Sequence, residues 1–342
     1  QGWGVPAHFG DPAEEYHALR NAAGLFDVGF LGRIEVSGSG SEGALQRSFT
    51  RNLSHLEEGS AVYGLFCNEQ GGIIDASLVF RLPSSGSGSS RRFLITAYAV
   101  ATERVRALIS GSDVEVAERT GSLAQLAVQG PHAGAVLEAA TGASFKRLKQ
   151  KNSKDIRLPD GPLLVSRTGF TAERGFELFL PSERARDLWK LLLDSGKSHG
   201  LLPCGLICRE MARVEAGYAV TGNELDETRN PVDAGLLSVI DPDAAFVSRA
   251  AVADLKTAGP RQKLVAFELY DKGPPLQGAT IFSDTKEIGA VTSAVHSIAR
   301  RKDIGLGYVL ARYGQPGQEI EIEFKDREAT AKVVMLPFYR RK

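Results

Sequence analysis

The sequence predicts an α+β protein in which a long region of helices and strands precedes a small all-β domain. Up to residue 258, segments with helical spacing alternate with strand-like runs. Past the linker KTAGPRQK near residue 260, only short apolar runs at regular spacing remain, with turn signals such as DKG, PGQ and KDRE between them. We therefore expect an α/β region over residues 1–258 and a β-barrel or sandwich over residues 259–342.

Composition limits the classes of partner. The chain has 342 residues, enough for two or three domains, and its 41 basic side chains equal its 41 acidic ones. No overall positive field attracts nucleic acid or an anionic membrane, and no apolar run reaches membrane length. Three cysteines cannot all pair, which is typical of a reducing cytosol, so we expect a cytoplasmic protein. A small neutral or weakly anionic ligand fits this composition.

The first part of the chain is expected to contain three helices, a hairpin and further short elements. Helical spacing covers residues 11–24, and a strand-like run over 25–38 breaks at Gly29. The runs 61–68 and 73–82 flank the turn signal EQGG and predict a β-hairpin. The other expected elements are a helix over 39–50, a loop over 83–92, a strand over 93–97 and a helix over 100–109.

The same order of elements starts again at Leu123. Residues 123–130 are strand-like, 131–140 helical, 163–181 a second hairpin, and Ser182 is expected to cap a following helix. This order suggests an internal duplication of about 33–118 and 123–217; two unrelated α/β segments are the alternative. In a duplication, the two hairpins face one pocket, with Tyr63 and the Asp75 and Ala76 region opposite Glu177.

Glu177 is the most informative residue of the second hairpin. In GFELFLP the apolar Phe176, Leu178 and Leu180 alternate with Glu177 and Phe179, so the carboxylate shares a strand face with an aromatic ring. On an edge strand, Glu177 would be solvated. If it is buried, its carboxylate can accept two parallel hydrogen bonds from a planar N–H edge, such as that of a pterin ring.

A short helix is expected over residues 203–217, and it places Arg209 and Arg213 four residues apart on one side. Like charges at this spacing repel each other. Either Glu210 and Glu215 neutralise them, or an anionic ligand lies between them.

Other sequence motifs give only weak evidence for a function. GSGSEG, over residues 38–43, has the spacing of a dinucleotide-binding turn, but the helix after it leads into a hairpin and not into a parallel strand. Cys204 and Cys208 have no histidine or further cysteine at ligand spacing, so no metal site is expected. The hydrolase patterns H-E-x-x-H and G-x-S-x-G do not occur.

A series of sequence blocks extends over nearly the whole chain. In order, they are GLFDVGFLGRIEV, NEQGGIID, LAVQGP, SRTGFTAERGFELFLP, CGLICREMARVEAG, GNELDE with NPVDAGL, IGAVTS and LPFY. Together they resemble the glycine-cleavage T-protein family of aminomethyltransferases. The resemblance implies a folate-binding fold with ferredoxin-like α/β elements and a C-terminal β-barrel. It also implies tetrahydrofolate as cofactor and a lipoyl carrier protein as partner, because the family transfers a one-carbon unit from an aminomethyl-lipoyl group to folate and releases ammonia.

The resemblance also implies roles for individual residues. Glu177 matches the glutamate that binds the pterin, and Arg209 matches an arginine of the folate site. Tyr63 and Phe170 match aromatic positions beside the ligand, where flat rings suit stacking; core packing is the alternative for both. Tyr339 follows LPF directly and is aligned less clearly with the folate-contacting tyrosine of relatives.

The departures from the family pattern affect the expected reaction. Relatives read GGIIDDL, and their second aspartate lies beside the reacting folate nitrogens; here the sequence is GGIIDAS, so Ala76 takes its place. Asp75 is the remaining candidate for a catalytic carboxylate, but on a strand it points to the opposite face unless a bulge shifts the register. Phe30, Leu31 and Ala97 replace further polar or sulfur-containing residues of relatives.

Three functions therefore remain open at this point. The first is a tetrahydrofolate-dependent aminomethyltransferase, weakened by the loss of the carboxylate at position 76. The second is a folate-dependent demethylase of another small methylated donor. The third is a folate-binding or regulatory protein without catalysis.

Overall fold

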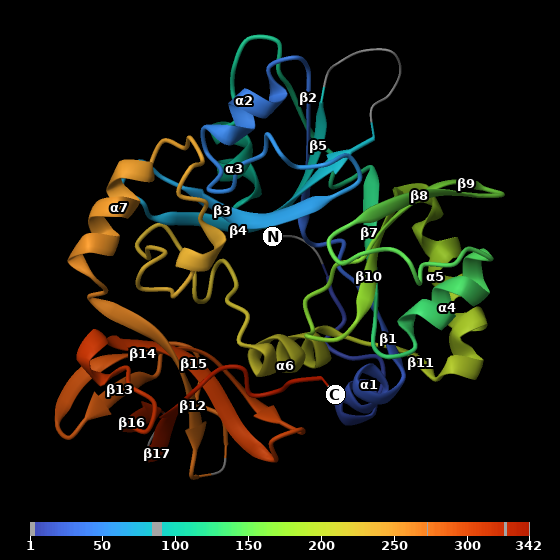
Figure 1. Ribbon diagram of the computed structural model, residues 1–342. Helices are drawn as coiled ribbons and strands as arrows, with labels where there is room; N and C mark the ends of the chain where they lie inside the picture. The colour runs from blue at the N-terminus through green and yellow to red at the C-terminus, as the bar shows by residue number, and fades with distance from the viewer. Residues whose placement is uncertain (1–3, 84–90, 272, 325–326, 342) are drawn as a thin grey trace.

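The computed structural model describes residues 4–83, 91–271, 273–324 and 327–341. Two β-sheets with their helices and a C-terminal barrel are arranged around a central region (Figure 1). Among the described residues, no helix combines the length and apolarity needed to cross a membrane. The predicted loop over 83–92 falls mostly outside the described residues.

The first sheet has five strands in the order β3-β4-β5-β2-β6. They are β2 (Gly32–Ser37), β3 (Ala61–Cys67), β4 (Ile73–Leu82), β5 (Arg92–Ala97) and β6 (Glu115–Glu118). Helices α2 (Ser41–Gln46) and α3 (Thr102–Leu108) pack on one face, where Leu45 and Val105 join a core with Ile34, Val79 and Ile95. The predicted hairpin is confirmed as β3 and β4, which are paired antiparallel.

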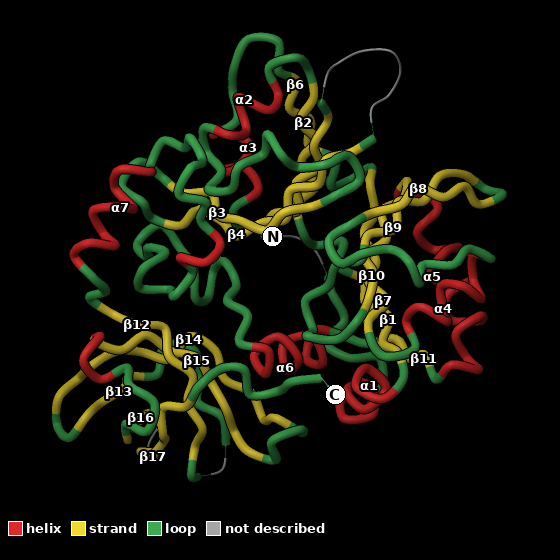
Figure 2. Tube along the Cα trace, viewed as in Figure 1, coloured by secondary structure: helices red, strands yellow, loops and turns green. Residues whose placement is uncertain are grey.

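The second sheet has six strands in the order β11-β1-β7-β10-β9-β8. They are β1 (Ala23–Asp27), β7 (Leu123–Gln129), β8 (Ser153–Leu158), β9 (Gly161–Ser166), β10 (Gly175–Pro181) and β11 (Leu201–Pro203). Helices α4 (Ala133–Thr141) and α5 (Ala185–Gly196) cover its outer face (Figure 2). Helices α1 (Pro12–Asn21) and α6 (Leu206–Ala216) pack on the other face. The break predicted at Gly29 is where the chain passes from this sheet to the first.

The C-terminal part is a closed barrel in the order β12-β15-β14-β13-β16-β17. Its strands are β12 (Gln262–Leu269), β13 (Thr280–Ser283), β14 (Lys286–Ser297), β15 (Lys302–Leu310), β16 (Glu319–Phe324) and β17 (Arg327–Val334). Buried side chains such as Phe267, Ile322 and Val333 fill it. The expected all-β domain is thus confirmed as a barrel. Helix α7 (Arg249–Ala258), which precedes it, was not expected.

Both sheets have the same strand order once β1 is set aside, namely β3-β4-β5-β2-β6 and β8-β9-β10-β7-β11. This order is what an internal duplication would produce, and we keep the duplication as an interpretation. One detail of the prediction is wrong: the counterpart of the first hairpin is β8 and β9, so Glu177 lies on the counterpart of β5. The expected cap is also wrong, because the Ser182 hydroxyl donates to Gly121 O at 2.7 Å instead.

The inner faces of the two sheets meet, and this contact positions the site. Phe80 of β4 and Phe179 of β10 pack edge to face with their ring centroids 5.3 Å apart. On β4, Ala76 and Leu78 share the face of Phe80, and on β10 Glu177 shares the face of Phe179. Next to this aromatic contact, the space between the sheets opens into a cavity that α6 helps to close.

Candidate functional site

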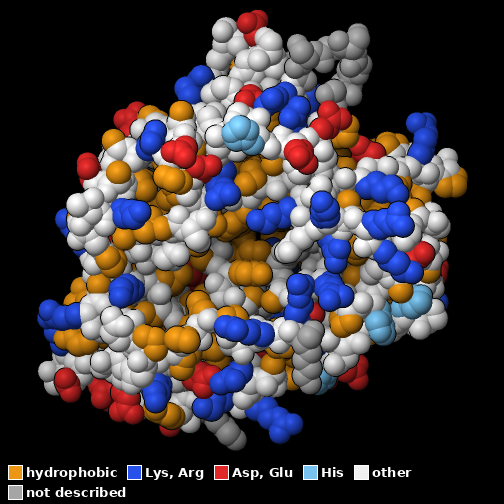
Figure 3. Space-filling view, in the orientation of Figure 1, with side chains coloured by type: hydrophobic (Ala, Val, Ile, Leu, Met, Phe, Trp, Pro, Cys, Tyr) orange, Lys and Arg blue, Asp and Glu red, His pale blue; other side chains and the backbone are white. Residues whose placement is uncertain are grey.

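A cavity of about 420 Å³ lies where the two sheets, α6 and the segment after α6 meet. Apolar side chains gather in a hollow near the middle of the face shown in Figure 3, with Lys and Arg side chains around it. The size is typical of a small-molecule site. Its lining includes Leu31, Tyr63, Ala76, Leu78, Thr96, Ala97, Tyr98, Arg167, Thr168, Phe170, Glu177, Arg209 and Tyr218.

Glu177 is the carboxylate of this cavity. It is only 7% exposed on a strand with a neighbour on each side, so the edge-strand interpretation is wrong. The Gln125 amide donates to its Oε1 at 3.0 Å, and the Thr168 hydroxyl donates to its Oε2. Burial raises the pKa of Glu177, although the Thr168 hydroxyl, the Arg209 charge and the Gln125 amide act in the opposite direction.

Gln125 adds a second acceptor beside this carboxylate. It is fully buried on β7, and its Oε1 has no hydrogen-bond partner among the described residues. A carboxylate can accept about four hydrogen bonds, and Glu177 receives two from the protein. The Glu177 carboxylate, which lines the cavity, therefore fits a ligand edge that carries N–H groups, as a pterin does, whereas Gln125 holds this carboxylate without lining the cavity itself.

Arg209 and Arg213 differ in their surroundings. Arg213 is fully buried and pairs with Glu224 at 2.9 Å and with Glu210. Glu215, the other acid expected to neutralise this pair, binds elsewhere on the molecule. Arg209 lines the cavity, where the nearby positive charge of its guanidinium favours ionisation of Glu177. One arginine is therefore structural, and the other is available to a ligand.

Aromatic rings surround the Arg209 guanidinium. Its central carbon lies 4.8 Å from the Phe170 ring centroid and 5.4 Å from that of Phe30. Phe170 also packs against Tyr218 at 5.2 Å and lies 6.3 Å from Tyr98. These contacts hold the guanidinium at the cavity wall, which keeps its charge near Glu177 while rings remain available for stacking.

Strand β4 turns Ala76 toward the cavity and Asp75 away from it. Its bulge lies before Asp75, and from there the pairing with β3 is regular, so the two residues occupy opposite faces. Asp75 is fully buried, accepts hydrogen bonds from the Ser77 hydroxyl and from Tyr98 N, and does not line the cavity. Burial raises its pKa to about 6. Asp75 could therefore act on a ligand only through its neighbours.

A second hollow of about 330 Å³, here called the outer chamber, adjoins the cavity and shares Gln150, Arg167, Thr168, Gly169 and Tyr218 with it. Its other lining residues are mostly charged: Glu173, Arg174, Arg340 and Arg341, together with Tyr339. Positive charge therefore prevails here, although the whole chain is neutral.

The structure brings all of the residues predicted as ligand contacts, Glu177, Arg209, Tyr63 and Phe170, to one cavity. Sequence reasoning missed Gln125, Tyr98, Thr168 and Tyr218. A single glutamine inside the apolar run LAQLAV was the available signal for Gln125. Tyr98 comes directly after β5 and Tyr218 two residues after α6, outside the regular elements whose pattern indicates which way a side chain points.

Comparison with known proteins agrees with this geometry. Residues 1–244 match the GCVT N-terminal domain, and residues 262–340 match the glycine cleavage T-protein C-terminal barrel domain. The chain is 37% identical to an aminomethyltransferase of Geobacillus kaustophilus, over 99% of this chain and 93% of that protein. It is 36% identical to one of Halothermothrix orenii, over 98% of this chain and 94% of that protein. The crystal structure of glycine cleavage system aminomethyltransferase T from Bartonella henselae superimposes with a TM-score of 0.90 at 27% identity, covering 100% of this chain and 93% of that one. The chain belongs to the glycine cleavage T-protein (aminomethyltransferase) family.

Proposed function

We propose that this protein binds tetrahydrofolate in the cavity between the sheets and acts in one-carbon transfer as an aminomethyltransferase. The observation that carries the proposal is the buried Glu177 carboxylate, which lines a cavity of suitable size together with Arg209. Similarity to aminomethyltransferases over the full chain supports the same reaction.

Several residues would hold the folate. Glu177 would accept hydrogen bonds from the N–H edge of the pterin, and Gln125 and Thr168 keep the carboxylate oriented. Tyr63, Phe170 and Tyr98 offer ring faces and exclude water from the cavity. The outer chamber, with its arginines, suits the anionic glutamate of the ligand.

Bound tetrahydrofolate supplies the two nitrogens that accept the one-carbon unit. In the overall reaction, the carbon leaves the sulfur of an aminomethyl-lipoyl carrier, the C–N bond of the aminomethyl group breaks, ammonium departs and the lipoyl thiol is freed. No oxidant is needed. The chain's own part is to orient the folate through Glu177 and to keep the cavity dry.

Position 76 governs how fast this reaction runs. Ala76 offers the cavity a methyl group, and the neighbouring Asp75 is turned away from it. A charge placed against a developing positive carbon is commonly worth about 10²–10³-fold in rate. We therefore expect tight folate binding with slow turnover, and a folate-binding protein without catalysis is the second candidate.

The test measures binding and turnover separately. Tetrahydrofolate binding is measured by calorimetry, and ammonia and methylene-tetrahydrofolate are followed with an aminomethyl-lipoyl carrier as donor. The variants are Ala76→Asp, which restores a carboxylate in the cavity, and Asp75→Asn, which removes the buried one.

Binding with slow turnover that Ala76→Asp raises supports an aminomethyltransferase with a weakened site. Binding without turnover in either protein favours the non-catalytic candidate. Failure of the wild-type protein to bind tetrahydrofolate would overturn the proposal.

A further inference from the structure

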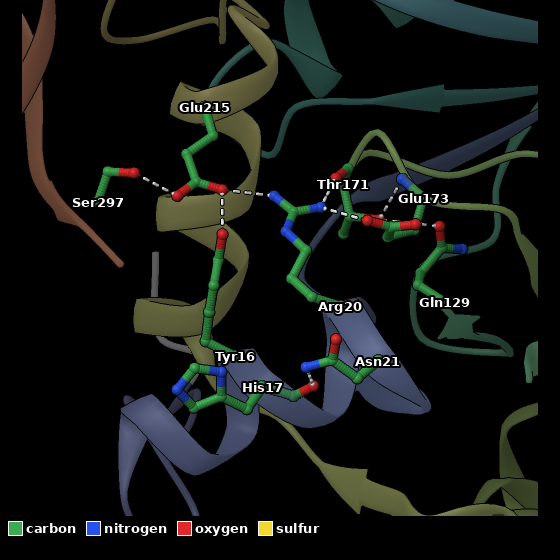
Figure 4. Close-up of polar contacts among 9 residues, drawn as sticks. All are labelled: Tyr16, His17, Arg20, Asn21, Gln129, Thr171, Glu173, Glu215 and Ser297. Carbon is green, nitrogen blue, oxygen red and sulfur yellow. Dashed lines mark hydrogen bonds and ion pairs between the residues drawn. The ribbon is translucent and has the colours of Figure 1, made fainter. Parts of the chain in front are cut away.

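A buried polar cluster lies behind the cavity wall, centred on Arg20 of α1. Its Nη2 donates to Glu215 Oε2 at 2.6 Å, and its Nη1 donates to Thr171 O at 2.7 Å and to Glu173 Oε1 at 3.0 Å. Tyr339 covers the guanidinium, with the ring centroid 3.8 Å from the Arg20 central carbon. Figure 4 shows Arg20 between Glu215 on one side and Thr171 and Glu173 on the other.

Glu215 extends the cluster across α6. The Tyr16 hydroxyl donates to its Oε2 and the Ser297 hydroxyl to its Oε1, each at 2.6 Å (Figure 4). Its backbone carbonyl accepts from Tyr339 N at 3.0 Å. Ser297 belongs to the barrel strand β14, so the Glu215 carboxylate connects α1, α6 and the barrel, and its backbone carbonyl adds the C-terminal segment.

The segments joined by Arg20 are those that carry cavity residues. The loop of residues 167–174 supplies Thr168 and Phe170, and α6 supplies Arg209. The C-terminal segment supplies Tyr339 to the outer chamber. Arg20 itself lines neither space, so any effect that it has on a ligand acts through these segments.

The 167–174 loop is held at its two ends by backbone hydrogen bonds, from Arg167 N to Asn152 O at 2.8 Å and from Gly130 N to Arg174 O at 2.7 Å, and Arg20 binds the part between them. Ala172 has φ +64°, a left-handed conformation that a residue with a Cβ rarely adopts. The Arg20 bond to Thr171 O lies directly before this residue. On the other side, the Gln129 side chain lies so close below Gly169 and Gly175 that a Cβ at either position would overlap it. The loop is thus fixed between Gln129 and Arg20.

We propose that Arg20 is a positioning residue for the folate cavity, which holds the 167–174 loop and the C-terminal segment against α6. This inference rests on the proposed function for its ligand. Removing the guanidinium would leave Glu215 buried without its cation and release Thr171 O, so Phe170 would lose its fixed place beside Arg209.

The experiment compares Arg20→Met, which keeps an unbranched apolar side chain but removes the guanidinium, with Arg20→Lys, which keeps the charge but cannot reach both sides of the cluster. The matched control is Ile322→Ala, which lowers stability through a cavity inside the barrel, far from the ligand. Each protein is assayed for tetrahydrofolate Kd, thermal stability, KM and kcat, and for hydrogen exchange of residues 167–174 without ligand.

We expect Arg20→Met to weaken tetrahydrofolate binding by roughly 10- to 100-fold, since misplacement of a wall by about 1 Å has effects of this size. Arg20→Lys should weaken it less, and KM should rise more than kcat falls. Hydrogen exchange of the loop should increase in both variants. Ile322→Ala should lower stability and leave Kd unchanged.

An Arg20 variant, Met or Lys, that folds, binds tetrahydrofolate as the wild type does and keeps slow exchange in the loop would overturn the inference. If Arg20→Met does not fold, Arg20→Lys decides the question alone. Failure of the wild type to bind folate refutes the proposed function instead, and the ligand-free exchange then tests whether Arg20 still orders the loop.

Discussion

Replacing Glu177 by glutamine tests whether its carboxylate binds the ligand, because the shape of the side chain changes little. The carboxylate receives hydrogen bonds from Gln125 and Thr168 and keeps acceptor capacity for a ligand. The amide of a glutamine offers one oxygen, and its NH₂ group meets donors. Glu177→Gln therefore removes the negative charge and at least one acceptor that faces the cavity.

The effect on affinity follows from the strength of charged hydrogen bonds. A hydrogen bond to a charged group contributes about 1.5–3 kcal/mol, and a donor left facing donors adds to the loss. A total of about 2–4 kcal/mol corresponds to a Kd for tetrahydrofolate roughly 30- to 1000-fold weaker. Calorimetry at neutral pH measures this directly.

The same substitution should change how stability depends on pH. Burial raises the pKa of Glu177, so the folded state binds its proton more tightly than the unfolded chain does. This group therefore lowers stability as pH rises from the unfolded pKa of about 4.3 through the raised folded pKa, and the full loss is present above it. Glu177→Gln cannot ionise, so this pH-dependent loss of stability should be absent when its melting temperature is measured against pH.

The matched control is Glu35→Gln. Glu35 is paired with Arg92 and Arg119 on the first sheet and does not line the cavity. This variant should leave Kd unchanged. Equal tetrahydrofolate affinity in Glu177→Gln and wild type, with both proteins folded, would refute the claim that the Glu177 carboxylate binds the ligand.

Two further predictions concern buried charged residues other than Glu177. Burial raises the pKa of Asp75 to about 6, so this group lowers wild-type stability as pH rises from about 4 to about 6. Denaturant titrations of Asp75→Asn should lack that part of the pH dependence. If the free energy of unfolding changes with pH equally in the variant and the wild type, Asp75 is not its source. Arg213→Met leaves Glu224 buried without its cation and should lower the free energy of unfolding by about 3–5 kcal/mol in urea. The double variant with Glu224→Gln should recover much of the loss; no recovery would mean that the pair is not the cause.

Periodic elements of the fold could be predicted from the sequence. The hairpin of β3 and β4, the alternation around Glu177 and the six barrel strands all have one apolar face, which gives a clear pattern. Strands β6 and β8 were missed because they lie at sheet edges and carry polar or charged residues on both faces, as EVAE and SKDIRL show. Without one apolar face, such strands have no periodic signal.

Glu177 could be singled out as a charged residue in an apolar run, but its ligand role and that of Arg209 came from the resemblance to the T-protein family. Spacing alone could not distinguish Arg209 from Arg213, since the partner Glu224 is eleven residues beyond Arg213 and reaches it only through the fold. The cluster around Arg20 and Glu215 was invisible for the same reason, as its two charges are 195 residues apart. Long-range pairing of charges is decided by packing, which sequence spacing does not record.

A crystal structure of the protein with tetrahydrofolate tests the central claim most directly. We predict density for the pteridine in the cavity between the sheets, with its N–H edge on the Glu177 carboxylate and its glutamate toward the outer chamber. Density for the folate at another place on the molecule, or a pteridine turned away from Glu177, would contradict the account.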